Sequence, residues 1–346
     1  MMTFLMALLG LNTSCGQQPY DNMDVEAFAD YVANKHVQLL DVRTVEEYAE
    51  SHIDGALQAD VKSNDFMEKA KAQLSKSQPV AVYCRSGRRS ATAAKLLSAE
   101  GYKVTNLKGG IMAWTSKGKP TSLVQVDAFV TPGGKTIKFY ALMHASIRIV
   151  FDGKEMQIDP VRQLGDRTTD YTAMPKADYL LVTHEHQDHF DKEAIRLLSD
   201  ENTQFITNAR CADMMSYGQV MSNGDTQALS EEITLEAVPA YNTTEGRTQF
   251  HPKGRDNGYV LTLDGLRIYI AGDTEDIPEM AQLGTIDIAF LPCNQPYTMT
   301  TDQLVRAARV IKPRVLFPYH FGKADVTLLP SQLSADAIDV RLRHYE

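Results

Sequence analysis

The densest group of potential metal ligands in the sequence is the segment 183–189, which reads THEHQDH. It directly follows an apolar run that is typical of a buried strand. Side chains alternate in extended backbone, so His184, His186 and Asp188 lie on one side and His189 turns to the other. Three imidazoles and a carboxylate at this spacing can hold one or two divalent ions of the zinc or manganese type. The segment therefore predicts a metal site at the end of a strand.

A second reactive group is the thiol of Cys84, which ends another apolar run. The residues after it are Arg85, Ser86, Gly87, Arg88 and Arg89, and a helical stretch begins at Ser90. Backbone N–H groups at a helix start, together with three arginines, attract an anion and lower the pKa of the thiol. The alternative is a structural cysteine among solvated arginines, and the density of positive charge argues against it.

Two regions with different patterns must position these groups, and the polar segment Thr115–Gln125 joins them. Before it, short apolar runs such as Val80–Tyr83 alternate with helical stretches, which predicts a parallel sheet covered on both faces. After it, the pattern changes to hairpins around Asp-Gly turns, at 147–159 and 259–273. A length of 346 residues also suggests two domains, at roughly 150 residues per domain.

The second region contains one unit twice. In the first copy, the hairpin is followed by the strand 178–184, the helix 192–198 and a further strand. In the second copy, it is followed by the strand 287–293, the helix 302–310 and a further strand. Two such halves packed face to face place both sets of strand-end loops on one edge. The first copy carries histidines there and the second carries Cys293, so the ligands are asymmetric although the scaffold is symmetric.

The composition excludes several classes of function. Hydrophobic residues make up 43% and charged residues 23%, as in ordinary globular proteins. The net charge of -9 argues against a nucleic-acid partner, which would require a basic patch. No apolar run of roughly 18 residues follows residue 20, so we expect no membrane-spanning helix. Cys211 and Cys293 have no basic neighbours and are expected to be small buried hydrophobes.

Residues 1–18 have the pattern of an export signal. An apolar stretch, Met1–Leu11, runs into small residues before Cys15 and then turns polar. This resembles a bacterial lipoprotein signal, in which the cysteine is lipidated and becomes the mature N-terminus, although no lysine or arginine precedes Lys35. We expect an exported, periplasmic or membrane-anchored protein tethered through Cys15, with a cytoplasmic protein as the alternative.

Three further motifs also carry residue types that bind metals: Asp159 after an apolar strand, Asp273 in Gly-Asp-Thr, and His320 in Pro-Tyr-His-Phe-Gly. Together with the His-x-His-x-Asp-His signature, they make residues 126–346 resemble the metallo-β-lactamase superfamily. The resemblance implies an αββα sandwich that holds two divalent ions, zinc or manganese, with iron as the alternative. It places His184, His186 and one further histidine in the first site, and Asp188, His189 and His320 in the second, with Asp273 between them.

One ligand of that family has no direct counterpart in this sequence. The family has a histidine after the strand that here ends in Val238-Pro239-Ala240, where this chain has Tyr241 and Asn242. His251 lies further along the loop and can serve if the loop folds back. Otherwise His251 is an exposed or substrate-contacting histidine, and the first site has fewer protein ligands or uses Asn242.

Residues 19–119 resemble the rhodanese family of sulfurtransferases, with residues 120–125 as the linker. Besides the Cys84 loop, the supporting motifs are Leu40–Arg43, Glu47-Tyr48 with His52–Ala56, and Gly109–Trp114. The resemblance implies that Cys84 takes the outer sulfur of thiosulfate or a persulfide and carries it as a persulfide, while residues 85–89 bind the donor. Related cell-cycle phosphatases need a loop one residue longer, so sulfur fits this loop and phosphate does not. Asp41 and Arg43 are expected to brace the loop, His52 to hydrogen-bond near the sheet end, and Trp114 to lie in the core.

The two halves together predict an enzyme with two activities on small molecules. One is sulfur transfer through Cys84; the other is hydrolysis of an ester, lactone or phosphodiester by metal-bound hydroxide, with Asp188 in the catalytic centre. The motifs around Asp159 and Asp273 look closest to ascorbate-6-phosphate lactonases and N-acyl-phosphatidylethanolamine phospholipase D.

Two alternatives remain. The first is an iron persulfide dioxygenase that acts on sulfur delivered by the rhodanese half, although such fusions generally place the rhodanese after the metal domain. The second is a module that senses sulfane sulfur or docks, attached to a metallohydrolase. The intact Cys84 loop disfavours the second alternative.

Overall fold

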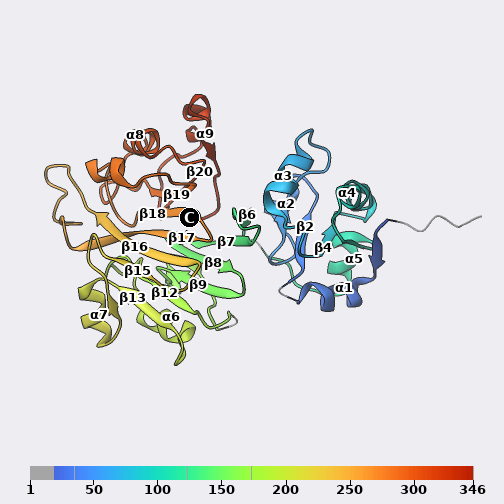
Figure 1. Ribbon diagram of the computed structural model, residues 1–346, viewed down its shortest axis with the longest axis horizontal. Helices are drawn as coiled ribbons and strands as arrows, with labels where there is room; N and C mark the ends of the chain where they lie inside the picture. The colour runs from blue at the N-terminus through green and yellow to red at the C-terminus, as the bar shows by residue number, and fades with distance from the viewer. Residues whose placement is uncertain (1–18, 35, 123, 173, 346) are drawn as a thin grey trace, which may run out of the picture.

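The computed structural model describes residues 19–34, 36–122, 124–172 and 174–345. The expected export signal and its Cys15 lie outside these residues. Within the described ranges, every helix is too short or too polar to cross a lipid bilayer. The chain forms two lobes that lie side by side, the N-terminal lobe in blue and teal and the C-terminal lobe in green to red in Figure 1.

The N-terminal lobe is a five-stranded parallel sheet in the order β1-β5-β4-β2-β3. The predicted strand Val80–Tyr83 is the central strand β4, and all four of its residues are buried. Its side chains alternate between two apolar clusters, one with helices α3 and α4 and the other with α1 and α5. Cover on both faces explains why the run is continuously apolar. The strands are β1 (Asp21–Met23), β2 (Gln38–Asp41), β3 (Leu57–Gln58), β4 and β5 (Val104–Leu107); the helices are α1 (Val25–Val32), α2 (Val45–Glu50), α3 (Phe66–Gln73), α4 (Arg88–Ala99) and α5 (Gly110–Ser116).

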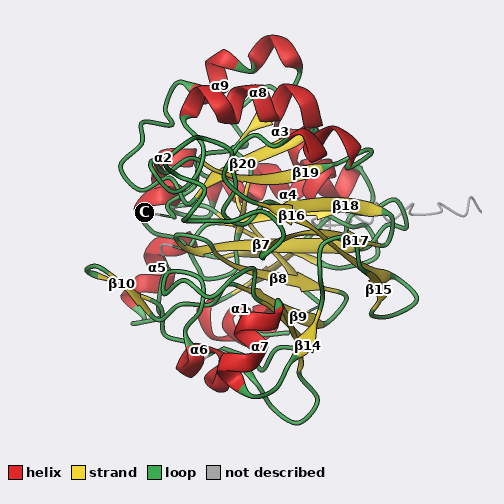
Figure 2. Ribbon diagram, turned by 90° about the vertical axis from the view of Figure 1, so that its left-hand side faces the viewer, coloured by secondary structure: helices red, strands yellow, loops and turns green. Residues whose placement is uncertain are grey.

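The C-terminal lobe is an αββα sandwich, as expected. Two seven-stranded sheets have the orders β14-β13-β12-β9-β8-β7-β6 and β15-β16-β17-β18-β19-β20-β21. Figures 1 and 2 show helices α8 and α9 beyond one sheet and α6 and α7 beyond the other. The first sheet contains β6 (Val126–Val130), β7 (Thr136–Met143), β8 (Ser146–Phe151), β9 (Lys154–Ile158), β12 (Tyr179–Leu181), β13 (Gln204–Thr207) and β14 (Gln219–Val220). The second contains β15 (Thr226–Ala228), β16 (Ile233–Ala240), β17 (Asp256–Leu263), β18 (Leu266–Ile270), β19 (Ile288–Pro292), β20 (Val315–Tyr319) and β21 (Asp339–Val340). The helices are α6 (Lys192–Leu198), α7 (Ala209–Met215), α8 (Thr301–Ile311) and α9 (Leu329–Gln332), and β10 (Gln163–Leu164) and β11 (Arg167–Thr168) form a separate hairpin.

The repeat predicted from the sequence is present in the pairing of the strands. In the first sheet, the hairpin β8–β9 is antiparallel and is followed by the parallel neighbours β12 and β13. In the second sheet, β17–β18, β19 and β20 repeat that order and those directions. Both halves therefore direct the C-terminal ends of corresponding strands to one edge of the sandwich.

Aromatic side chains fill the space between the two sheets. Phe139 of the first sheet contacts Phe290 and Phe317 of the second, and the last two stack at 4.9 Å between ring centroids. Each is almost fully buried, and burial of such a side chain contributes about 1.5–3 kcal/mol. This contact fixes one sheet against the other, and with it the relative position of their strand ends.

The two lobes meet along β6, which packs against α3 and β3. The Tyr48 hydroxyl accepts a hydrogen bond from Val126 N at 3.1 Å and donates one to Ala56 O at 2.7 Å. The predicted linker also contacts the N-terminal lobe, because Ser122 pairs with His52 in an isolated β-bridge and Val124 O lies 2.8 Å from His52 Nε2. The connection is therefore part of the packed junction.

Candidate metal centre and cysteine site

The candidate metal ligands come from strand ends in both sheets of the sandwich. His184 follows β12 of the first sheet, whereas Asp273 and His320 follow β18 and β20 of the second. Parallel strands carry their C-terminal ends to one edge, and the two sheets are packed face to face. The loops after these strands are therefore brought together across the sandwich.

The ligand atoms form two groups of four, and within each group they lie within 4.8 Å of one another. All seven side chains that the sequence singled out as metal ligands belong to one of these groups, in the expected division between two sites. The structure adds His144 to the second. The first site consists of His184, His186, His251 and Asp273; the second consists of His144, Asp188, His189 and His320.

Asp273 lies between the two sites. Its Oδ2 atom is 3.2 Å from His251 Nε2 and 3.8 Å from His184 Nε2, on the side of the first site. Its Oδ1 atom is 3.1 Å from His189 Nε2 and 3.4 Å from His320 Nε2, on the side of the second. One carboxylate thus faces both groups with a different oxygen.

Several of these atoms are buried without a hydrogen-bond partner among the described residues. They include the Nε2 atoms of His189, His251 and His320 and the Oδ1 atom of Asp273. Buried polar atoms are nearly always paired, so a cluster of unpaired ones requires an explanation. Imidazole and carboxylate are the ligands that zinc, manganese and iron share. The residues present therefore fit two divalent ions.

The charges of the carboxylates agree with this assignment. Burial alone would raise the pKa of Asp273, but His320 and His189 hold that pKa well below its usual range. Burial also opposes ionisation of Asp188, and His189, His144 and His320 together lower its pKa far below the ordinary value. Both shifts favour the ionised carboxylate, which is the form that binds a cation.

The metal centre is closed on most sides. The side chains of His184, His189, His251 and His320 are at most 1% exposed. Asp188 is 31% exposed, and His186 is partly exposed. Solvent and any substrate therefore reach the centre beside Asp188.

Asp159 orients one ligand and holds the loop that carries three others. Its Oδ2 atom is 2.8 Å from His189 Nδ1, and its two oxygens accept hydrogen bonds from Thr183 N and Thr183 Oγ1 at 2.8 and 2.7 Å. The carboxylate fixes the imidazole so that Nε2 faces the metal centre, which is how outer-shell carboxylates commonly act on metal-bound histidines. Asp159 is therefore a positioning residue and not a ligand.

The loop that carries His251 folds back onto the metal centre. The Oε2 atom of Glu275 accepts hydrogen bonds from the backbone N–H groups and hydroxyls of Thr243 and Thr244, at 2.7–2.8 Å. Asn242 N then donates to His251 O at 2.9 Å. These contacts hold the loop after β16 in a folded-back conformation, which places His251 beside the other candidate ligands. The structure thus places His251, and not Asn242, in the first group of ligands. The side-chain amide of Asn242 donates to Tyr297 O at 2.8 Å.

His144 is the member of the two groups that sequence reasoning missed. It lies in the tight turn between β7 and β8, in left-handed backbone with φ of 55°. Its N–H donates to Tyr345 O at 2.6 Å, and its carbonyl accepts from His320 N at 3.2 Å. The available signal was a lone histidine at a turn between two apolar strands. No local spacing connects it with the other ligands.

Cys84 lies at the C-terminal end of β4, and its thiol is surrounded by donors. Gly87 N donates to Cys84 Sγ at 3.2 Å, and Ser90 Oγ donates to it at 3.4 Å. Burial raises the pKa of the thiol, but the hydrogen bonds from Ser90, Ser86 and Gly87 outweigh burial and bring the pKa below its ordinary value. The loop therefore stabilises a thiolate, as its position before a helix predicts.

The arginines beside Cys84 do not all have the predicted role. Arg89 makes two hydrogen bonds of 2.7 Å to the carboxylate of Glu47, so its charge is neutralised by that partner. Arg85 and Arg88 are exposed and pair with no carboxylate in the described part of the chain. They are the arginines that remain for an anionic donor, whereas Arg89 anchors the loop to α2.

Helix α5 supports the loop from behind, which explains the Gly109-Gly110 pair. Ile111 N and Met112 N donate to Cys84 O and Arg85 O at 2.8 and 3.2 Å. A Cβ atom on Gly110 would lie 2.2 Å from Cys84 O, so only glycine permits this approach.

Several other residues of the N-terminal lobe were expected to have structural roles, and their contacts show where each one lies. Asp41 and Arg43 form a buried ion pair at 2.6 Å, and Arg43 donates to Ser51 O, so they brace the end of β2. Arg43 also lies over the ring of Tyr83, the residue that precedes Cys84. His52 hydrogen-bonds near the sheet end, with Nδ1 2.9 Å from Tyr48 O. Trp114 is buried in the core, as are Cys211 and Cys293 in the other lobe.

Comparisons with known proteins agree with both lobes. Residues 24–117 match the family model of the rhodanese-like domain. Residues 137–320, more than half of the chain, match the model of the beta-lactamase superfamily domain.

Similar proteins are described as metal-dependent hydrolases. A UPF0173 metal-dependent hydrolase of Ligilactobacillus salivarius is 30% identical over 185 residues, which cover 52% of this chain and 82% of that protein. A UPF0173 metal-dependent hydrolase of Nanoarchaeum equitans is 30% identical over 156 residues, covering 43% and 72% of the two chains.

Solved structures give the same result. A crystal structure from Parabacteroides distasonis, assigned as a metal-dependent hydrolase, is 48% identical with a TM-score of 0.62 and covers 64% of this chain and all of its own. Igni18, a metallo hydrolase from Ignicoccus hospitalis, is 26% identical with a TM-score of 0.51 and covers 60% of this chain and 94% of its own. The chain therefore belongs to the beta-lactamase superfamily, as a metal-dependent hydrolase that carries a rhodanese-like domain before its metal domain.

Proposed function

We propose that the C-terminal lobe is a dinuclear hydrolase of small esters, lactones or phosphodiesters that uses two zinc or manganese ions. The observation that carries this proposal is the position of Asp273 between two complete groups of ligands, with one oxygen toward each. A divalent ion lowers the pKa of its bound water to roughly 7 and polarises a substrate oxygen. Two full groups favour two ions over the single iron of a persulfide dioxygenase.

The residues of the chain divide the work. Asp159 and Asp256 each hold an imidazole, those of His189 and His251, at 2.8 and 3.0 Å. The ionised Asp188 lies at the open side, where substrate enters, and can accept a hydrogen bond from the water that attacks. The buried histidines keep bulk water out of the closed side of the centre. The exclusion of water strengthens electrostatic contacts with a substrate.

The test is a panel of substrates and one matched pair of variants. The protein loaded with zinc or manganese is assayed on an aryl ester, a γ-lactone and an aryl phosphodiester. We expect turnover of at least one substrate class, and we expect the double variant His186→Ala/Asp188→Ala to lose both the metal and that turnover. The variant Glu193→Gln, in the first turn of α6, where the side chain is 47% exposed, is the control. Turnover that persists in the double variant would show that the hydrolysis occurs elsewhere.

We also propose that Cys84 transfers sulfur, because its thiolate is stabilised beside two exposed arginines. The thiolate attacks the outer sulfur of thiosulfate, the S–S bond breaks and sulfite leaves with the electron pair, so Cys84 becomes a persulfide. An acceptor such as cyanide takes that outer sulfur, which yields thiocyanate and restores the thiolate. Cys84→Ser should abolish thiocyanate formation and leave the metal content unchanged. Thiocyanate formed by this variant would contradict the assignment.

A further inference from the structure

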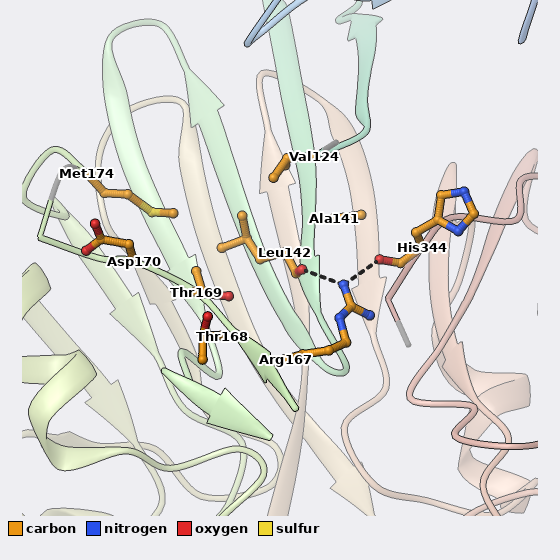
Figure 3. Close-up of a pocket in the computed structure, with 9 residues that line it drawn as sticks. All are labelled: Val124, Ala141, Leu142, Arg167, Thr168, Thr169, Asp170, Met174 and His344. Carbon is orange, nitrogen blue, oxygen red and sulfur yellow. Dashed lines mark hydrogen bonds between the residues drawn. The ribbon is translucent and has the colours of Figure 1, made fainter. Parts of the chain in front are cut away.

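A pocket of about 570 Å³ lies beside the metal centre, between the hairpin β10–β11 and the strand β7. Two lining residues are close in sequence to parts of the second metal site. Leu142 lies two residues before the candidate ligand His144. His344 directly precedes Tyr345, whose carbonyl accepts a hydrogen bond from His144 N. Val124 of the interlobe connection also lines the pocket. Figure 3 shows how these side chains surround the space.

The hairpin that forms one wall is held at both ends. At its base, Arg162 donates from N and Nε to Asp191, at 3.1 and 2.8 Å, and Asp191 is the N-cap of the helix that follows the metal ligands. At its other strand, Arg167 Nη2 donates to His344 O at 3.1 Å and to Leu142 O at 3.4 Å, as the dashed lines in Figure 3 mark. The pocket therefore has fixed walls on both sides.

Among the described residues, Arg167 has no anionic partner. Its guanidinium contacts carbonyl oxygens, and its Nη1 atom is buried without a hydrogen-bond partner among the described residues. Among the described lining residues, the one carboxylate is that of Asp170, which accepts hydrogen bonds from Thr172 N and Oγ1 at 2.9 and 2.6 Å. A half-buried cation without a counterion is costly, and an anion in the pocket would remove that cost.

Part of the lining is apolar. Val124, Ala141, Leu142 and Met174 supply it, and Figure 3 shows the side chains of Leu142 and Met174 directed toward one another. Thr168 and Thr169 add hydroxyls beside Arg167. One guanidinium and no lysine in the lining suit a single negative charge better than a phosphate dianion.

We propose that this pocket binds an organic carboxylate with a short alkyl chain, its carboxylate on Arg167 and its chain against Leu142 and Met174. The volume is that of a small-molecule site. The inference concerns binding alone, so it stands independently of which bond the metal centre cleaves.

The test is calorimetric titration of the metal-loaded, full-length protein with hexanoate. Hexanoate should bind, whereas hexylammonium, which has the wrong charge, and acetate, which lacks the chain, should bind at least about tenfold more weakly. Arg167→Gln should weaken hexanoate binding by about tenfold or more, since a hydrogen bond to a charged group is lost. Thr168→Glu should do the same by placing a carboxylate beside Arg167, whereas Thr226→Glu, the same change at an exposed residue of β15 outside the lining, should leave the binding unchanged.

Thr168 is exposed, so Thr168→Glu tests the site even if Arg167→Gln fails to fold. Hexanoate that binds all these variants equally would overturn the proposal, as would an absence of binding. Binding that survives Thr168→Glu and disappears in the metal-depleted His186→Ala variant would place the carboxylate on the metal ions and would also overturn it. A failure of the hydrolase assay would affect none of these outcomes.

Discussion

The Nδ1 atom of His251 lies 3.0 Å from the Oδ2 atom of Asp256, the first residue of β17. Asp256 is itself held by Arg255, which donates to both carboxylate oxygens at 2.6 and 2.8 Å. The imidazole is thereby fixed with Nε2 toward Asp273 Oδ2, at 3.2 Å. A histidine in a long loop thus gains the rigidity of a residue at a strand end.

Replacement of this orienting carboxylate should weaken the first metal site. We expect Asp256→Asn to lower metal affinity by about 10- to 100-fold, as is typical when an outer-shell partner of a ligand is changed. Competition with a fluorescent chelator measures the affinity of each ion. The affinity of an ion bound at the second site should be unchanged. An unchanged affinity for both ions would show that Asp256 does not act on the metal.

Loss of His251 should remove one ion. The variant His251→Ala should bind about one metal per chain where the unchanged protein binds about two, since each site relies on four protein ligands. Elemental mass spectrometry of protein purified without chelators measures the ratio. Asn242→Ala is the control, because the side-chain amide of Asn242 donates to Tyr297 O and makes no hydrogen bond to a candidate ligand among the described residues. If Asn242→Ala lost metal and His251→Ala did not, Asn242 would be the ligand and His251 would not.

His144 should be as important for the second site as His251 is for the first. We expect His144→Ala to lose the second ion, whereas Met143→Leu, a change in the neighbouring apolar residue, should retain both. Anomalous scattering from crystals of each variant locates the remaining ion. An ion that still lies between Asp188 and His320 in His144→Ala would show that this histidine is dispensable.

The Cys84 thiol should react at lower pH than a free cysteine. Because Ser90, Ser86 and Gly87 stabilise the thiolate, the midpoint of alkylation by iodoacetamide should lie below about 8.5, the value of a free thiol. Ser90→Ala removes one donor, so it should raise the midpoint and slow alkylation at neutral pH. Cys211 provides an internal reference, since burial raises its pKa to about 12. A midpoint that does not move in Ser90→Ala would exclude the hydroxyl as a cause.

The extent to which the sequence predicts this molecule depends on how local each signal is. The segment from His184 to His189 could be recognised because its ligands share one strand end, and the Cys84 loop because its charges are adjacent. His144 and the Glu47 partner of Arg89 could not, since each contact joins residues from separate elements. His251 was recognised only as one of two alternatives, because Glu275, in another loop, determines how its loop folds.

The order of the ligands along the chain has a consequence for synthesis and assembly. His144 lies in the first hairpins of the sandwich, and His320 follows β20, its last long strand, so the second site spans nearly the whole domain. No fragment that ends before β20 can form both sites. Ions that join the two halves act as cross-links between them. Metal uptake is therefore expected after translation of β20, as a late step that closes the two halves on each other.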